Sequence, residues 1–146
     1  MNLNNTHDRE RYGFLWSEVR LVVAAVALLI GGVPPIYLVA PPGLFGIARL
    51  GLLVCWVISG IAAIYLLYRW HVANHTLFGR KNTKDMIAFL VMTISGVNLG
   101  LTALLSKNIG MSIDHSRLVF TLTAIAYIAA GYHLYTRWKA HGEKLF

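Results

Sequence analysis

The chain has 146 residues, of which 57% are hydrophobic and only 13% are charged. A soluble domain carries about 25% charged residues, so this composition excludes an ordinary soluble protein. The net charge of +7 could indicate a nucleic-acid-binding protein, but the basic residues gather beside apolar runs, which explains the charge better. No nucleic acid is therefore expected as a partner. Cys55 is the only cysteine, so no intrachain disulfide can form.

Four runs of the chain are long and apolar enough to cross a membrane, at residues 21–40, 50–68, 86–106 and 118–136. A span needs ~20 apolar residues because a helix rises by ~1.5 Å per residue. The runs are apolar on every face, unlike the strands of a membrane barrel. Backbone groups in lipid must be satisfied within the segment, which requires helices. We expect an all-α integral membrane protein with four transmembrane helices.

The expected organisation is a single membrane domain over residues 1–146, built from two tandem helical hairpins. Residues 1–20 form a polar lead-in that is too acidic for a cleaved signal peptide, so we expect an uncleaved anchor. Hairpins over residues 21–68 and 86–136 follow, with a basic loop between them and a basic tail after them (residues 69–85 and 137–146).

Glycine and proline interrupt the first apolar run. Gly31 and Gly32 precede Pro34 and Pro35, and proline removes a backbone donor and clashes one turn back. The helix, which should begin near residue 16 or 21, is therefore expected to kink or stop near residue 33. One interpretation is a helix end with an outer turn, and the alternative is a kink that opens a cavity between helices.

The positions of lysine and arginine predict the orientation. Ten of the 13 lie on the side of the termini and the middle loop, against three on the other side. We expect the richer side, and with it both termini, to be cytoplasmic. The ten are Arg9, Arg11, Arg20, Arg69, Arg80, Lys81, Lys84, Arg137, Lys139 and Lys144, and the three are Arg49, Lys107 and Arg117.

The two hairpins carry similar ends. Residues 49–70 and 117–138 each open with arginine, continue with uncharged residues and close with Arg-Trp, which predicts a tandem repeat. Tryptophan and basic side chains are enriched at the headgroup level of a bilayer. We therefore expect a set of interfacial anchors consisting of Trp16, Arg69, Trp70, Arg137 and Trp138.

Residues 85–138 resemble the YuzA-like family of small two-helix bacterial membrane proteins, whose function is unknown. The resemblance depends on Gly-Val-Asn-Leu-Gly-Leu at 96–101 and on Ser116-Arg117 at the start of the next helix. Leu99 departs from the tryptophan that the family often has. The resemblance implies helical hairpins and a bacterial cytoplasmic (inner) membrane, and it brings no activity or cofactor.

Polar and small residues mark one face of the third helix. Ser95, Asn98 and Thr102 share this face, beside the GxxxG pair Gly96 and Gly100. Small residues let helices approach closely, and buried amides bond across the contact. We interpret the face as a contact with a neighbouring helix or a second subunit. The alternative is that Asn98 lines a path for a solute. No lysine, arginine, aspartate or glutamate lies in a span core, so no ion-coupled relay is indicated.

The sequence contains no catalytic motif and no metal-ligand spacing, so we expect no enzyme, no cofactor and no metal site. Asp85 is interpreted as a first-turn acid and Thr83 as its helix cap. His133 with His71 or His75 could hold a haem, but interfacial histidines are the simpler interpretation.

Three functions follow as hypotheses. The first is a structural or accessory subunit, in contact with the lipid bilayer, that packs as a homo-oligomer or with other membrane subunits. The second is a small oligomeric channel or transporter with a path near Asn98, and the third is a haem-carrying membrane subunit.

Overall fold

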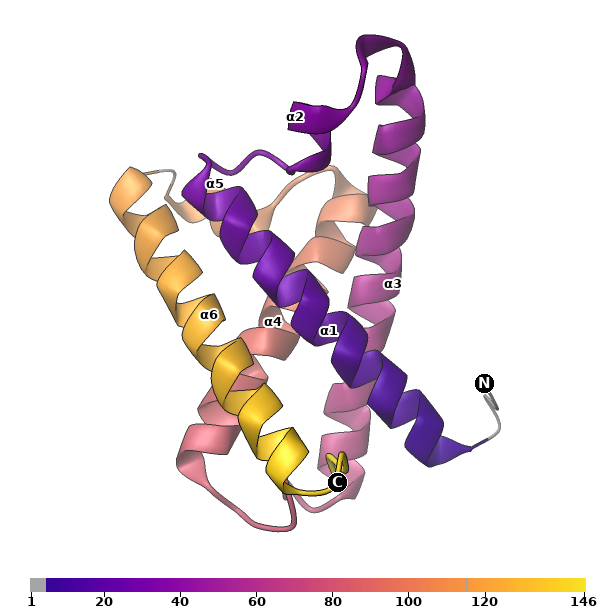
Figure 1. The fold of residues 1–146 in the computed structure, drawn as a ribbon, viewed down its shortest axis with the longest axis vertical. Coiled ribbons are helices and arrows are strands. Elements are labelled where there is room, and N and C mark those ends of the chain that lie inside the picture. The colour runs from indigo at the N-terminus through magenta and orange to yellow at the C-terminus, as the bar shows by residue number, and fades with distance from the viewer. Residues whose placement is uncertain (1–4, 115) are drawn as a thin grey trace.

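The computed structural model of the chain describes residues 5–114 and 116–146, and residues 1–4 of the predicted lead-in lie outside it (Figure 1). The described residues form helices and no strand, which confirms the all-α class. Four helices, one of them preceded by a 3-10 turn, are long and apolar enough to cross a membrane. The elements are α1 (Thr6–Leu29), α2 (Ile36–Val39), η1 (Pro42–Leu44), α3 (Phe45–Val72), α4 (Thr83–Leu105), α5 (Ile109–Ile113) and α6 (Arg117–Ala140).

The first long helix differs most from the sequence prediction. α1 begins at Thr6, where the Asn5 side chain accepts a hydrogen bond from the His7 backbone at 3.1 Å. It ends at Leu29, so the candidate span covers most of the predicted polar lead-in and stops before residue 40. A helix of 24 residues is about 36 Å long, enough to cross a bilayer. The predicted span 21–40 and its lead-in are therefore displaced along the chain.

Two glycines follow the end of α1 and turn the chain away from the helix axis. Gly31 and Gly32 have φ of 93° and 82°, a left-handed conformation that glycine adopts without strain. Gly32 also needs its small size, because an added Cβ would lie 2.9 Å from the Phe120 ring of α6. Pro35 then precedes the short helix α2. The chain stops being helical three to four residues before the expected position.

The four long helices form one bundle (Figure 1). α3 packs most extensively on α4, and α1 packs most extensively on α6. These two pairs join the two halves of the chain. α1 also contacts α3, and α4 contacts α6, so the bundle does not divide into independent hairpins.

Glycine allows the closest helix crossing. A Cβ added at Gly60 of α3 would lie 2.8 Å from the Cα of Gly100 of α4. One turn away, a Cβ added at Gly96 would lie 2.7 Å from the Cβ of Ala63. The predicted GxxxG face therefore packs inside the chain, against Gly60 and Ala63. Such close approach is how small residues stabilise helix pairs in lipid.

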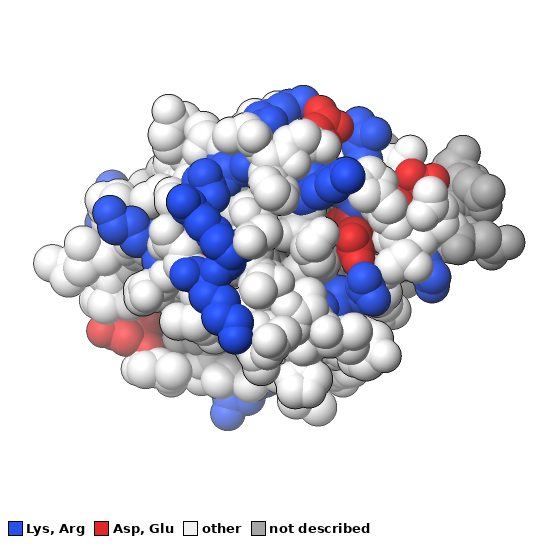
Figure 2. All heavy atoms as spheres, turned by 90° about the horizontal axis from the view of Figure 1, so that it is seen from below, with Lys and Arg blue, Asp and Glu red and all other residues white. Residues whose placement is uncertain are grey.

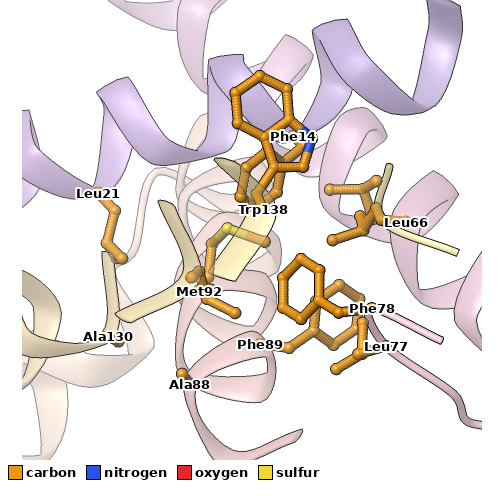
Figure 3. Packing of buried hydrophobic residues seen from close by; sticks show 12 residues of the cluster. Phe14, Leu21, Leu66, Leu77, Phe78, Ala88, Phe89, Met92, Ala130 and Trp138 are labelled. Atoms are coloured by element: carbon orange, nitrogen blue, oxygen red, sulfur yellow. The ribbon is translucent and has the colours of Figure 1, made fainter. Parts of the chain in front are cut away.

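The hydrophobic core occupies one half of the bundle, and Figure 3 shows how its residues pack. Phe14 of α1 lies 5.3 Å from Trp138 of α6, measured between ring centroids, and Phe89 and Met92 of α4 are fully buried nearby. Trp138 is only 2% exposed, so it is a core residue and not the headgroup-level anchor expected from the sequence.

The C-terminal tail closes this end of the molecule. The Phe78 backbone N–H donates to the Leu145 carbonyl at 2.8 Å, and Leu145 is buried. Glu143 pairs with Arg11 at 2.9 Å and accepts a hydrogen bond from Lys139, which holds the pKa of Glu143 below its ordinary value. The start of α1, the α3–α4 loop and the tail therefore meet at one end. Lysine and arginine gather on this end (Figure 2), which we call the basic end.

Large hydrophobic side chains cover the outside of the bundle. Every long helix contributes such residues, as expected for a surface that faces lipid rather than water. Examples more than half exposed are Val22, Leu50, Val54, Ile94, Leu122 and Ile125.

The helix crossing gives a testable prediction. Gly60→Ala should lower the free energy of unfolding by about 1–3 kcal/mol, because the new methyl group would overlap Gly100. Gly51→Ala is the matched control on the same helix, since nothing lies within 4 Å of its added Cβ. Unfolding of both variants is measured in mild detergent with increasing denaturant. Equal stability of the two variants would contradict the crossing.

Candidate functional site

A cavity of ≈440 Å³ lies among the four long helices, in the half that the core does not fill. It reaches from Arg20 and Ser95 to Pro34 and Asp114 in the connecting segments. Pockets for small molecules usually occupy about 300–1,000 Å³. A second hollow of ≈490 Å³ lies between α2 and the start of α3 and is bordered by four residues, Tyr37, Phe45, Gly46 and Arg49. We place the candidate site in the first cavity, because side chains of all four long helices surround it.

The cavity is amphipathic. Apolar groups from several helices form most of its wall, and polar groups gather at its deep end and its mouth. The apolar lining includes Leu28, Leu52, Trp56, Leu99 and Phe120, and the polar lining includes Arg20, Ser59, Ser95, Asn98, Thr102, Asn108, Asp114, Thr123 and Tyr127. A mostly apolar wall with a few placed polar groups is typical of a ligand site.

Arg20 is the charged group of the deep end. Its side chain is 7% exposed, and Nη1 and Nη2 donate to Ser95 Oγ at 2.9 Å and to the Met92 carbonyl at 2.6 Å. Its Nε has no acceptor among the described residues. No carboxylate of the described chain lies within 4.0 Å of its guanidinium. The expectation that no charged residue lies in a span core is therefore wrong, because Arg20 belongs to the span formed by α1.

Glu18 is a second buried charged residue of α1. It is 7% exposed, and one oxygen lies close to α6, where a Cβ added at Gly131 would be 3.2 Å from it. The other oxygen, Oε1, has no hydrogen-bond partner among the described residues. No oxygen of Glu18 lies within 4.0 Å of the Arg20 guanidinium, so the two buried charges interact only at longer range and form no direct ion pair.

The polar face predicted on the third helix lies on this cavity. Ser95, Asn98 and Thr102 all line it, and so do Gly32 and Pro34 from the predicted kink. Gly31 and Pro35, the other two residues of that kink, are not among the lining residues. Gly96 and Gly100 face α3 instead, as described above.

Asn98 has a role that its sequence context does not indicate. Its Nδ2 donates to Asn108 Oδ1 at 2.9 Å, and its Oδ1 accepts from the Ile109 backbone at 3.2 Å. Asn108 in turn caps α5 by accepting from the Met111 backbone. Asn98 therefore holds the α4–α5 connection over the cavity, and it does not bridge two long helices.

Trp16 also contributes to the cavity. Its Nε1 donates to Ser59 Oγ of α3 at 3.0 Å, so the indole joins two helices inside the bundle. The sequence predicted an interfacial position for Trp16. The difference arises because α1 starts ten residues earlier, which places Trp16 inside the span.

The remaining predicted anchors lie near the basic end. Arg69 Nε donates to the buried Glu10 at 2.5 Å. The Trp70 ring packs on Phe89, with ring centroids 5.6 Å apart. Arg137 lies 3.4 Å from Asp85, and both belong to the cluster described next.

Asp85 is the centre of a polar cluster that sequence reasoning missed. It is fully buried in the first turn of α4, and His133 Nε2 lies 2.7 Å from its Oδ1. Arg80 approaches its other oxygen at 3.8 Å. The cap of this helix is Asn82, which accepts from the Lys84 backbone, and not Thr83 as predicted.

The histidines considered for haem have other contacts. His133 contacts Asp85, whereas His71 and His75 pack edge to face with ring centroids 5.3 Å apart. Among the described residues, no group of three or more His, Cys, Asp or Glu side chains is placed to hold a metal ion.

No family model, no curated protein and no solved structure matches this chain. The resemblance of residues 85–138 to the YuzA-like family therefore stays a prediction. The function has to be argued from the cavity and its side chains.

The Asp85 cluster supplies a prediction about stability. Asp85→Asn should lower the free energy of unfolding by about 1–3 kcal/mol, because the partly buried Arg137 would lose its carboxylate partner and the more exposed Arg80 a weaker one. Denaturant unfolding in detergent measures the change. Asp8→Asn, a first-turn acid of α1 that contacts no cation in the described chain, is the control. If both variants unfold alike, the cluster is not a stabilising feature.

Proposed function

We propose that this protein is a small non-enzymatic transporter of the membrane, which takes a small solute into the cavity between its helices. The observation that supports the proposal is the cavity itself. It extends from the connecting segments to a buried arginine past the middle of α1. Binding sites at mid-membrane depth with irregular backbone beside them are typical of transporters. The break at residues 30–35 supplies such backbone here.

The cavity favours a carrier over an open channel. Its deep end lies at Trp16, Arg20 and Ser95, and beyond them the core residues Phe14, Phe89 and Leu134 are fully buried. A solute at Arg20 can go no further unless helices rearrange. This is the alternating-access arrangement, in which one side of the site is closed while the other is open.

The accessory-subunit hypothesis loses one of its supports in this arrangement. The small size of the chain, the missing catalytic motifs and the small-residue face motivated it, and the face of Gly96 and Gly100 is occupied by α3 of the same chain. A partner subunit would have to use the outer apolar surface, which lipid also covers. For the haem hypothesis, the contact of His133 with Asp85 provides no support.

We further propose that the protein resides in a bacterial cytoplasmic membrane with its basic end inside. The excess of lysine and arginine at that end supports this orientation (Figure 2). Both termini are then cytoplasmic, and the cavity opens toward the outside.

Cys55 allows a direct test of water access to the cavity. It is the only cysteine of the chain, it is free, and it lines the cavity. Sealed, right-side-out vesicles are treated with the membrane-impermeant sulfonatoethyl methanethiosulfonate. We expect Cys55 to be modified, because a thiol reacts as thiolate only where water reaches it.

The matched control moves the cysteine by one position. Val54 is 58% exposed on the lipid-facing surface and does not line the cavity, so Val54→Cys in a Cys55→Ser background should stay unmodified. Protection of Cys55 equal to that of the control would contradict a water-filled cavity. Modification of Cys55 only from the cytoplasmic side would contradict the orientation.

A further inference from the structure

We propose that the cavity binds an amphipathic anion, with its acidic headgroup on Arg20 and its hydrocarbon part along the apolar wall. This inference rests on the proposed function, because it names the class of solute that the same cavity accepts. The shared chemistry is a carboxylate, sulfonate or phosphate attached to an apolar chain. A free metabolite and an anionic lipid both fit this description, and the experiment below separates them.

The first argument is the charge at the deep end. A guanidinium inside a membrane-embedded bundle is costly unless an anion or several acceptors compensate it. Arg20 has two acceptors, Ser95 Oγ and the Met92 carbonyl, and both are neutral groups. No carboxylate of the described chain lies within 4.0 Å of it, and Glu18, whose carboxylate lies close to α6, interacts with it only at longer range, so the guanidinium has no direct anionic partner at the end of the cavity.

The second argument is the supply of hydrogen-bond donors. A guanidinium has five N–H groups in a planar fork that matches the oxygens of a carboxylate or phosphate. Arg20 uses one N–H on each terminal nitrogen, and its buried Nε has no acceptor in the described chain. Ser95 and Met92 hold the guanidinium in place, and the second N–H of each terminal nitrogen is left for an anionic ligand.

The third argument is the chemistry of the wall. Between Arg20 and the mouth, leucine and aromatic side chains from α1, α3, α4 and α6 dominate the lining, among them Leu28, Trp56, Leu99 and Phe120. Asp114, the acidic residue of the lining, lies at the opposite end from Arg20, beyond the end of α5. A small inorganic anion would leave this wall unused, whereas a hydrocarbon chain would cover it. The combination favours an amphipathic ligand that enters with its headgroup toward Arg20.

The experiment compares probes with the same tail and different headgroups. Decane chains that carry a bromine near the headgroup end in a sulfonate, a hydroxyl or a trimethylammonium group, and bromine quenches tryptophan on contact. Trp16 and Trp56 both line the cavity and report on its occupation. The protein is held in nanodiscs of phosphatidylcholine. After correction for partition into lipid, the sulfonate should quench at a concentration about tenfold or more below that of the other two probes.

Three variants test the role of Arg20. Arg20→Gln should remove the preference for sulfonate, whereas Arg117→Gln should keep it, because Arg117 is exposed and does not line the cavity. Ala24→Leu should abolish quenching by all three probes. Ala24 lines the cavity one turn after Arg20, so a larger side chain there fills the space above the guanidinium and leaves the charge in place.

The outcomes separate this inference from the proposed function. Equal binding of the three probes, abolished by Ala24→Leu, would overturn the anion preference and leave a solute cavity. Quenching that is the same in wild type and in Ala24→Leu would show that nothing enters, and both proposals would fail. If Arg20→Gln does not fold, the headgroup preference of the wild type and its loss in Ala24→Leu still decide the question.

A further measurement distinguishes a lipid headgroup from a free anion as the ligand. Phosphatidylglycerol is added to the nanodiscs before the sulfonate probe. Displacement of the probe in wild type identifies a lipid headgroup as an occupant of the site, and undisturbed probe binding identifies a free amphipathic anion. Both results support the inference, because the headgroup chemistry is the same.

Discussion

The structure depends on how α1 places a buried arginine. A cationic side chain cannot face hydrocarbon without a large cost, so the face of α1 that carries Arg20 has to turn into the bundle. Ser95 Oγ and the Met92 carbonyl of α4 then accept its hydrogen bonds. This contact fixes both the rotation of α1 and its height relative to α4. Glu10, buried and paired with Arg69 of α3, fixes the same helix near its start.

The position of α1 divides the bundle into two unlike halves. Toward the basic end, Phe14 packs on Trp138 and the tail covers the core, so this half is closed. Toward the other end, α1 stops at Leu29 and the chain leaves the bundle through Gly31 and Gly32. No hydrophobic core fills the space between the helices there, and this space is the cavity. Packing at one end and a hollow interior that reaches Arg20 at the other are the features on which the proposed transporter function depends.

Sequence reasoning succeeds where a helix is apolar all round. Three of the expected spans, at residues 50–68, 86–106 and 118–136, fall almost entirely within α3, α4 and α6. These runs contain no charged residue, so their mean hydropathy is high along their whole length. The prediction of the first span is wrong, because Glu18 and Arg20 lower the mean hydropathy of residues 6–20 and made this segment look like a polar lead-in. Their burial, and the hydrogen bonds of Arg20 to α4, depend on tertiary contacts that hydropathy does not report. The buried positions Phe14, Ser17, Leu21 and Ala25 are spaced three and four apart, and this pattern could have extended the helix toward Thr6.

The candidate site shows the same division. The shared face of Ser95, Asn98 and Thr102 follows from helical spacing alone, and the three residues do meet at one cavity. The partners of Asn98 lie ten to twelve residues further on, in a connection whose path no periodicity fixes. Arg20 itself could not be recognised as a site residue once α1 was placed too late in the chain. The late start predicted for α1 therefore also explains why Arg20 was missed as a site residue.

The depth of α1 in the bilayer tests this account most directly. Nitroxide labels at Val22, Val26 and Leu29, each more than 40% exposed and none lining the cavity, are compared for collision with oxygen and with a water-soluble nickel complex. With α1 spanning residues 6–29, the label at Val22 should be the deepest and the label at Leu29 the shallowest. The reverse order would mean that the span runs from residue 21 to residue 40, with Arg20 at the membrane surface, and would contradict the buried arginine and the site built on it.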